Sequence, residues 1–558
     1  MIPQSSTRAP MAVLLTGLII GFILARNFTA PSGLLLTFAL VGSLAALLLA
    51  RKETLTPLWL FAFTVSATLC FWSYGNIRLT PEPTAFDLEM PQREARLTLK
   101  VKTVMRSNEH HGITNMVAQV LHSPEIGRLR RGDLIYTRLK LSQQKHLIEQ
   151  PIIHIQKGFL IDATGVLEPI QQPPKTEKQR NFDAYLKSIG VHYRFDQLSE
   201  LQITKTSSAF TGFCSAMNHR FQKILRLGAP EDSGLANIYV TMLLGDNAAL
   251  TREQSERYRM TGTMHFFAIS GLHIGVIAAV IAQNLLLLRI PRSWSPWIGL
   301  PLLYLYVAIT GASPSAMRAF LMAAFFWASF PFRRQHSSFA ALVNSAVFVL
   351  LLDPDQLWSL GFQLSYIVVA SILLLGLPAA QVLREAFPIY QWLPEEDWTT
   401  RQRIASWSIH KMIPLFTISV SAWLASVPIC AAFFNFIAPG AIVLNLLLVY
   451  LVAIVIISGI LSAGCAALFL SPISEFINHA AWFTIFVMDS IVRLGTIIPN
   501  ITFQNGASLG KLTYVVLSAY FLSLFWLHHR YGKIKLSHIS LPMFILLGSM
   551  GVIFFLNL

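Results

Sequence analysis

The chain has 558 residues, of which 54% are hydrophobic and only 13% are charged. Soluble domains carry roughly a quarter charged residues, so this composition, with a mean hydropathy of +0.54, excludes a soluble enzyme. Lys and Arg number 43 against 28 Asp and Glu, a formal net charge of +15. A basic excess indicates anionic partners or, equally, the Lys and Arg that mark the cytoplasmic loops of membrane proteins.

Three apolar runs open the chain, at about 11–25, 33–50 and 57–74. Each approaches the roughly 20 residues that a helix needs to cross a bilayer core. The first run is interpreted as an anchor and not as a signal peptide, because no clean small-residue cleavage site follows Arg26. Residues 1–74 are therefore predicted to form three transmembrane helices.

Residues 75–205 have a different composition, in which charges, Pro and Gly interrupt short apolar stretches. Apolar and polar residues alternate at 96–102 and again at 135–141, which is the period-two pattern of half-buried strands. We predict a soluble all-β domain inserted after the third transmembrane helix. An OB-type barrel, a small barrel that binds oligonucleotides, fits this pattern.

Apolar spans resume after amphipathic connecting helices at 206–262, and residues 263–558 are expected to form a membrane channel domain. The spans lie at about 263–288, 294–311, 315–331, 337–352, 360–378, 412–434, 438–470, 511–527 and 540–557. The run 438–470 is too long for one straight crossing, so we expect Gly459 and Gly464 to break it into a hairpin or a tilted pair. The stretch 474–498 carries four ionisable residues and is expected to lie on the membrane surface. The fold class is a polytopic α-helical membrane protein with an inserted OB-like domain.

Basic clusters predict the orientation of the chain in the cytoplasmic membrane. Those that should face the cytoplasm are Arg51-Lys52, Arg289 with Arg292, Arg333-Arg334, and His528-His529-Arg530 with Lys533 and Lys535. Counting crossings from Arg51-Lys52 places the OB-like domain on the outer side. Residues 75–230 hold 22 Lys and Arg against 14 Asp and Glu. Orientation does not require this excess, so we interpret it as a binding surface.

The candidate contacts on that surface are basic residues with a tyrosine between them: Arg128, Arg130, Arg131, Arg138, Lys140 and Lys145, with Tyr136. Aromatic side chains stack on nucleic-acid bases and contribute about 1–3 kcal/mol per base. Further stacking candidates are Phe182, Tyr185, Tyr193 and Phe195. The alternative for each aromatic residue is a place in the core of the domain.

Polar residues at membrane depth are costly and by default indicate function. His265 and His273 flank Ser270-Gly271 and, eight residues apart on one helix, would project about 80° from each other. They either line a polar path or hydrogen-bond to neighbouring helices, and a metal site would lack a third ligand. Ser270 before Gly271 also matches the nucleophile of intramembrane serine proteases, but there the base usually comes from another helix.

The stretch 310–318 is typical of the start of a helix, with Ser313 as N-cap and a proline at the first helical position. The free amides of such a start, the hydroxyls of Ser313 and Ser315, and the guanidinium of Arg318 together suit a phosphate. This stretch is therefore a candidate part of a path for an anion.

Arg318 has a second interpretation, in which it pairs with a buried acid such as Asp353 or Asp246. Gln363 places an amide in a later apolar span. A single polar group there more often hydrogen-bonds to a neighbouring helix than contacts a substrate. Taken together, the polar residues of these spans indicate a polar interior.

Several motifs are absent from the sequence. Residues 506–513 resemble a phosphate-binding loop only faintly, because the second glycine is one residue too close and no strand precedes it. The chain has no HExxH, HxHxDH or CxxC motif, and three of its four cysteines lie in apolar runs. We expect no ATPase, no metal-dependent hydrolase, no cofactor and no catalytic residue.

Four segments in order carry a family resemblance: HFFAISGLHIG (265–275), TGASPSAMRAFLM (310–322), DPDQLWSLGFQLSY (353–366) and residues 428–445. They resemble the competence domain of ComEC-type DNA-internalisation proteins in sequence, order and spacing. NFDAYLKSIG (181–190) resembles that family's FDYxRYLxxxGI segment, and LLGD (243–246) resembles its LLLG element. The resemblance covers about 75–527, most of the chain.

The resemblance implies a polytopic channel that passes one DNA strand across the cytoplasmic membrane in natural transformation, with the external OB-type domain receiving DNA. Many members continue into a metallo-β-lactamase-like domain, whereas this sequence stops at Leu558 without those ligands. Either the sequence is a truncated piece or this member lacks the domain, so we carry over no nuclease activity.

The partners expected for such a channel are single-stranded DNA, membrane lipids, a DNA-receptor protein outside, a cytoplasmic motor or single-strand-binding protein inside, and a nuclease supplied by another protein. The expected membrane path is lined by His265, Ser270, His273, Ser313, Ser315, Arg318 and Gln363. The alternative function is a transporter or flippase for another polyanionic or lipid-linked substrate. An intramembrane hydrolase acting through Ser270 is a third hypothesis, for which we expect no labelling by a serine-directed probe.

Overall fold

The structure is a computed structural model of the 558-residue chain. It describes residues 10–50, 56–79, 91–108, 113–122, 129, 132–140, 158–170, 182–183, 186–187, 189–204, 209–230, 234–245, 250–331, 337–387, 392–434, 436–497, 503–504, 512–531, 538, 542–543 and 548. Contacts divide the chain into two compact units, residues 1–216 with 343–362, and residues 217–342 with 363–558.

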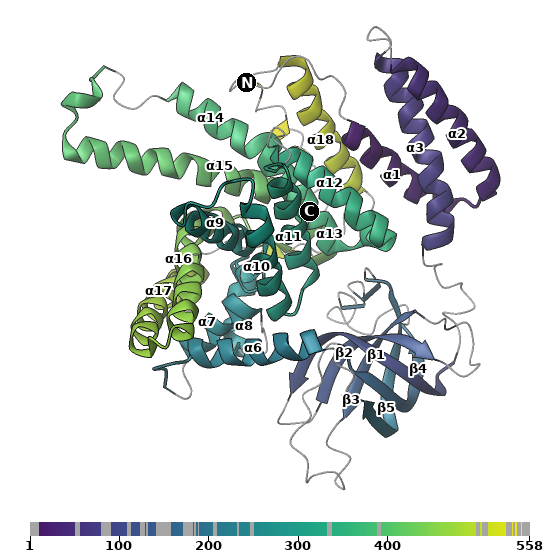
Figure 1. The fold of residues 1–558 in the computed structure, drawn as a ribbon, viewed down its shortest axis with the longest axis horizontal. Coiled ribbons are helices and arrows are strands. Elements are labelled where there is room, and N and C mark those ends of the chain that lie inside the picture. The colour runs from purple at the N-terminus through teal and green to yellow at the C-terminus, as the bar shows by residue number, and fades with distance from the viewer. Residues whose placement is uncertain are drawn as a thin grey trace. The chain divides into compact units, whose positions relative to one another are not determined.

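The first unit begins with three helices that pack side by side: α1 (Pro10–Asn27), α2 (Ser32–Leu49) and α3 (Thr56–Arg78) (Figure 1). Gly17 and Gly21 of α1 form a GxxxG pattern against α3. A Cβ atom at Gly21 would lie 2.7 Å from the carbonyl oxygen of Thr68. The two backbones therefore approach each other at a distance that only small residues allow, as is typical of membrane helices.

Helix α3 also caps the end of α12 (Ser338–Leu352). The Tyr74 hydroxyl donates to the carbonyl oxygen of Leu351 at 2.7 Å, and Arg78 Nη2 donates to that of Leu352 at 3.2 Å. These are two of the carbonyls that a helix C-terminus leaves without intrahelical partners. A cation near them is also favoured by the helix dipole.

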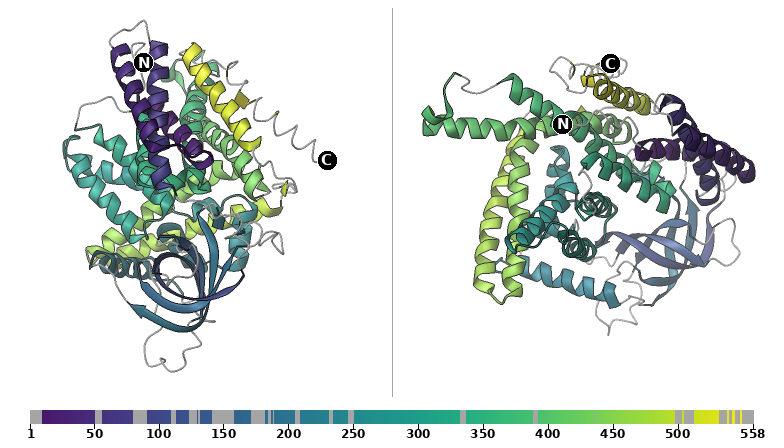
Figure 2. Two further views of the ribbon diagram at one scale, coloured as in Figure 1. Left: turned by 90° about the vertical axis from the view of Figure 1, so that its right-hand side faces the viewer. Right: turned by 45° about the horizontal axis from the view of Figure 1, so that its top comes forward.

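Five strands of the first unit close into a barrel: β1 (Arg93–Asn108), β2 (Ile113–His122), β3 (Leu134–Lys140), β4 (Leu160–Pro169) and β5 (Val191–Thr204). They follow the order β1-β2-β3-β5-β4, and β1 pairs with β4 to close the barrel. Only β3 and β5 run parallel among these pairs. Leu97, Leu99 and Val101 point inward and are at most 1% exposed, as their alternation predicts. The predicted OB-like barrel is confirmed (Figure 2).

The second unit is helical. Its leading elements are α6 (Ala209–Leu225, from Met217 on), α7 (Gly234–Leu244), α8 (Arg252–Met260), η6 (Met264–Phe266), α9 (Gly271–Leu287), α10 (Ser295–Ile309) and α11 (Pro314–Ala328). Two helices of 27 residues, α16 (Ala441–Ala467) and α17 (Ser471–Ile497), lie side by side (Figure 2). Buried residues of α7, α9, α10, α16 and α17 share one apolar core.

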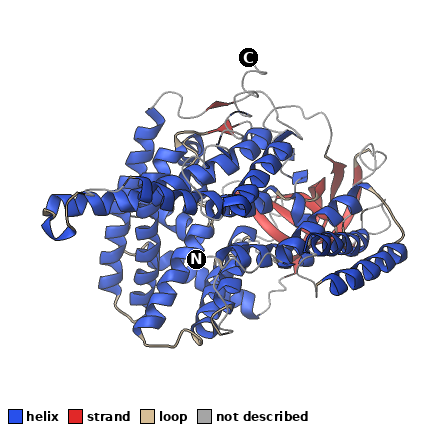
Figure 3. Cartoon of the chain, turned by 90° about the horizontal axis from the view of Figure 1, so that it is seen from above, coloured by secondary structure: helices blue, strands red, loops and turns tan. Residues whose placement is uncertain are grey.

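The remaining elements are η7 (Pro354–Trp358), α13 (Leu360–Ser371), the π-helical turn η8 (Ile372–Gly376), α14 (Leu377–Ala386), η9 (Glu395–Asp397), α15 (Thr400–Phe434), β6 (Phe436–Ile437), β7 (Phe503–Gln504) and α18 (Leu512–Tyr531). Helices predominate in the described part of the chain outside the barrel (Figure 3). Within the second unit, the Ser371 hydroxyl donates to the Ser421 carbonyl oxygen at 2.8 Å and lies 2.6 Å from the Tyr520 hydroxyl. This contact joins the end of α13 to α15 and α18.

Among the residues that the structure describes, six helical segments are long and apolar enough to cross a membrane: Ser32–Leu49, Pro57–Arg78, Leu360–Ala386, Thr400–Phe434, Ala441–Ala467 and Ser471–Ile497. Shorter apolar helices accompany them, among them α9, α10 and α12. The predicted fold class, a polytopic helical membrane protein, is confirmed. The predicted span 540–557 lies almost wholly outside the described residues, and the division into four domains at 1–74, 75–205, 206–262 and 263–558 stays a prediction.

Two expectations about the later spans are wrong. The run 438–470 does not break at its glycines, because α16 is one continuous helix and Gly459 lets Leu243 of α7 pack closely against it. The stretch 474–498 does not have the form of a surface segment. It belongs to α17, which has the length and hydropathy of a span, and its Asp489 is buried in ion pairs that offset the cost of the charge.

The close approach of α1 and α3 gives a first prediction. The substitution Gly21→Ala should lower the apparent melting temperature of the purified full-length protein, because the added Cβ meets the backbone of Thr68 and Trp72. Overpacking of this kind costs about 1–3 kcal/mol. The matched control is Gly33→Ala in α2, where nothing lies within 4 Å of the new Cβ. Equal melting temperatures for both variants would contradict the tight α1–α3 contact.

Candidate nucleic-acid interface

The outer face of strands β2 and β3 is covered by a segment of the same domain. Val117 lies on the opposite side of β2 from Met116 and Ala118, which face the barrel core. The described residues of 182–190, here called the strap, pack on that outer face. Its apolar cluster consists of Val117, Ile170, Leu186 and Val191, with Met105, Leu134, Tyr136, Phe182 and Ile189 against them. The strap thus occupies the face that OB folds use for oligonucleotides.

An ion pair and a ring contact hold the strap in place. Asp183 is 5% exposed and accepts from Arg194 of β5. The rings of Tyr136 and Phe182 meet edge to face, with centroids 5.3 Å apart. Burial raises the pKa of the Tyr136 phenol, and the charge of Arg194 opposes that rise. Because the strap packs against it, Tyr136 is half-buried, and its ring is in edge-to-face contact with the ring of Phe182.

The other barrel residues that were predicted to contact nucleic acid lie in different surroundings. Arg138 is exposed on β3, and Lys140 is the last residue of that strand. Tyr193 and Phe195 are 9% and 0% exposed in the barrel core, so the core alternative holds for both. Outside the described residues lie Arg128, Arg130, Arg131, Lys145 and Tyr185.

The expectation that His265 and His273 lie on one helix is wrong. His265 is exposed in η6, with Nδ1 3.0 Å from the carbonyl oxygen of Gly262. His273 is fully buried in the first turn of α9. Ser270 between them adopts an extended conformation and caps α9, which ends any continuous helix through this motif.

Ser270 and His273 form a capping box at the start of α9. The Ser270 backbone N–H donates to His273 Nδ1 at 3.3 Å, and Ser270 Oγ lies 3.0 Å from the same nitrogen. Such reciprocal contacts satisfy the free donors of a helix start. The serine and histidine therefore have a structural role. Within the part of the chain that the structure describes, no group of three or more His, Cys, Asp or Glu could hold a metal.

The predicted helix start at Ser313 is confirmed. Ser313 Oγ accepts from the backbone N–H of Ala316 at 3.3 Å, and a proline follows it at the first helical position of α11. Gly311 and Ala312 before it have φ values of 87° and 50°. Positive φ at alanine costs about 1–3 kcal/mol, and such strain clusters at functional sites. Ser315 is half-buried in the first turn.

Arg318 and Gln363 both connect to neighbouring helices. Arg318 is 5% exposed, and its Nη2 donates to Ser365 Oγ of α13 at 3.0 Å. Gln363 is half-buried, and its Oε1 accepts from the Tyr514 hydroxyl of α18 at 3.2 Å. The structure thus brings α11, α13 and α18 together through predicted path residues. Asp353 is exposed and accepts from Gln356 at 2.9 Å, and Asp246 lies outside the described residues.

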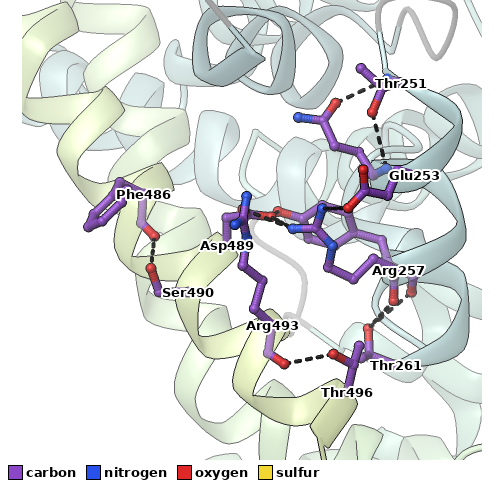
Figure 4. Close-up of polar contacts among 11 residues, drawn as sticks. Thr251, Glu253, Arg257, Thr261, Phe486, Asp489, Ser490, Arg493 and Thr496 are labelled. Carbon is purple, nitrogen blue, oxygen red and sulfur yellow. Dashed lines mark hydrogen bonds and ion pairs between the residues drawn. The ribbon is translucent and has the colours of Figure 1, made fainter.

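A buried charge cluster escaped the sequence analysis. Asp489 of α17 accepts from Arg257 of α8 at 3.1 Å, from Arg493 at 2.8 Å and from the Tyr258 hydroxyl at 3.1 Å (Figure 4). Glu253 adds an outer contact to Arg257 at 3.2 Å. The i,i+4 spacing of Asp489 and Arg493 was the only local signal, since Arg257 lies more than 200 residues away in the sequence.

Comparison with known proteins decides the family. The model of the competence protein family matches residues 242–530, about half of the chain. The chain belongs to the competence protein family. The matched range contains all seven predicted path residues, from His265 to Gln363, and the Asp489 cluster.

Individual relatives are more distant. The chain is 28% identical to ComE operon protein 3 of Bacillus subtilis over 228 residues, 40% of this chain and 29% of that protein. It is 31% identical to competence protein ComA of Neisseria gonorrhoeae over 158 residues, 26% of this chain and 22% of that protein. It is 22% identical to recombination protein 2 of Haemophilus influenzae over 368 residues, 59% of this chain and 45% of that protein. The chain thus matches less than half of the length of these relatives. No solved structure matches it.

The Asp489 cluster gives a second prediction. Asp489→Asn should destabilise the protein by about 3–5 kcal/mol, because Arg257 loses its buried counter-charge and keeps only the exposed carboxylate of Glu253. The matched control is Glu253→Gln, which removes an 87% exposed partner of the same arginine and should change stability by less than about 1 kcal/mol. Thermal unfolding of both purified variants tests this, and equal losses would show that Asp489 does not carry the α8–α17 contact.

Proposed function

We propose that this protein is a channel of the bacterial cytoplasmic membrane that passes single-stranded DNA inward during natural transformation. The observation that carries the proposal is the family match over residues 242–530, because it contains every predicted path residue. The names of relatives, which include competence and recombination proteins, support a role in DNA uptake.

The start of α11 is the most favourable place in the proposed path for a phosphate group. A helix N-terminus presents free amides and a partial positive charge. Ser313 and Ser315 add hydroxyls there, and Arg318 follows about one turn later. A guanidinium forks onto phosphate oxygens with two parallel hydrogen bonds. His265, which is exposed, and Gln363 would add further donors along the path.

The barrel would receive DNA on the outer side of the membrane. Its OB-type topology and the basic excess of residues 75–230 support this role. Because the strap packs on the outer face of β2 and β3, DNA would contact Arg138, which stays exposed on β3, and would not stack on a free Tyr136. The remaining predicted basic residues, Arg128, Arg130, Arg131, Lys140 and Lys145, stay candidates for contact with DNA.

The driving force would come from outside the chain, from other proteins or from the proton gradient, because the sequence has no phosphate-binding loop of the ATPase kind. A cytoplasmic motor or single-strand-binding protein would pull or trap the strand, and a receptor would deliver DNA outside. A separate nuclease would remove the second strand. The alternative function, transport of another polyanion or a lipid-linked substrate, differs in having no affinity for DNA.

The role of Arg318 gives a third prediction. In a competent bacterium that carries this gene in place of its own, Arg318→Ala should lower DNA uptake about tenfold or more, the effect of losing a charge-assisted hydrogen bond. Arg318→Lys should restore part of it. Ser365→Ala, which removes a hydrogen bond of Arg318 to α13, should change uptake little.

Labelled DNA that resists external nuclease measures uptake, and an immunoblot of the membrane fraction controls for insertion. Normal uptake in Arg318→Ala would remove this residue from the path. An equal loss in Ser365→Ala would assign Arg318 a packing role.

The barrel surface gives a fourth prediction. The full-length protein in nanodiscs should bind a labelled single-stranded oligonucleotide with an affinity that falls steeply with salt. Arg138→Gln should reduce the slope of log affinity against log salt by about 0.7, the value for one phosphate contact on a single strand. Arg96→Gln, an exposed arginine on β1, should leave the slope unchanged. Absence of binding at low salt would favour the alternative function.

A further inference from the structure

A groove of about 490 Å³ lies between α6 and the last turns of α16. Met217, Phe221 and Ile224 form its α6 wall, and Ile460, Gly464 and Phe469 belong to the other side. A Cβ at Gly464 would have nothing within 4 Å, so the floor of the groove is open there. The cavity is thus an apolar trough beside a helix that has the length of a membrane span.

Buried polar contacts fix the two walls relative to each other. Asn478 of α17 is fully buried and donates to the carbonyl oxygens of Ile224 at 2.7 Å and Leu227 at 3.3 Å. The Asn478 side-chain oxygen accepts from Ser462 of α16 at 2.7 Å. These bonds satisfy carbonyls at the end of α6. The groove is therefore held open by a specific network and not by chance packing.

The surroundings of the groove are apolar and exposed. Leu468 and Phe469 in the turn after α16 are 71% and 88% exposed, and Phe476 in the next helix is 75% exposed. Phe469 also has a φ of 60°, a conformation that bulky residues rarely adopt. Exposed aromatic and aliphatic side chains at the end of a span are typical of contact with the lipid interface.

One side of the groove is cationic. Arg220 is the single charged residue among those that line it, and His219 and Lys223 are exposed beside it on α6. An apolar trough with a guanidinium at its edge is complementary to an amphiphile with a negative headgroup. Long Arg and Lys side chains reach from apolar surfaces toward such headgroups.

We propose that this groove binds one anionic phospholipid of the surrounding bilayer, with an acyl chain along Ile460 and Gly464 and the phosphate at Arg220. The lipid would fill the space between α6 and the α16–α17 pair and so fix α6 at the membrane interface. This proposal is independent of the DNA role, because none of the groove residues belongs to the proposed path.

Native mass spectrometry of the purified full-length protein, given equimolar dioleoylphosphatidylglycerol and dioleoylphosphatidylcholine, tests the proposal. We expect one retained lipid, with phosphatidylglycerol preferred. Arg220→Gln should lower that preference about fivefold, the contribution of one basic residue near an anionic lipid surface, while a lipid is still retained. Excess inorganic phosphate should not displace the lipid.

A variant whose side chain fills the groove tests the position of the acyl chain. Gly464→Leu should abolish retention, because its side chain extends into the open floor of the groove. Gly33→Leu is the matched control, since that glycine also has open space around it but lies in α2. Unchanged retention in Gly464→Leu, or equal binding of both lipids by the wild-type chain, would overturn the proposal, as would displacement by phosphate.

Discussion

The cost of a charge in apolar surroundings shapes the second unit of this protein. Asp489 is nearly buried, and three donors from two helices compensate its carboxylate. Helix α8 is short and strongly polar, whereas α17 is a long apolar helix. Apolar packing alone would hold α8 only weakly, so the ion pairs with Asp489 stabilise its position against α17. Tyr258 of α8 and Phe266 of η6 also pack in the apolar core of this unit, so polar and apolar contacts hold this part of the chain together.

Arg318 and Arg257 differ in where they lie. The Arg257 guanidinium pairs with the Asp489 carboxylate of α17, so it holds two helices together. Arg318 lies about one turn into α11, and its Nη2 donates to the Ser365 hydroxyl of α13. A helix start presents free amides and a partial positive charge. Arg318 is a candidate for function because it follows such a start.

Local patterns allowed part of this structure to be predicted. The strands and the cap at Ser313 follow from short-range rules on alternation and helix starts. The α8–α17 ion pairs could not be predicted, because Arg257 and Asp489 are far apart in the sequence. The four ionisable residues of 474–498 therefore indicated a surface helix. The break between His265 and His273 was also missed, because Ser270-Gly271 is compatible with both a loosened helix and a cap.

The strap changes how the barrel can be used. Alternation along β2 predicts which residues face the core, but Val117 on the other face is also buried, which requires a partner from outside the strand. Phe182 and Leu186 supply it, and the Asp183–Arg194 pair adds a charged contact. The strap covers Leu134 and Tyr136 on the outer face of β3, whereas Arg138 on the same strand stays exposed. If the barrel binds DNA as proposed, electrostatic contact with the DNA backbone is the mode that this covered face would favour, because such contact requires no free aromatic surface.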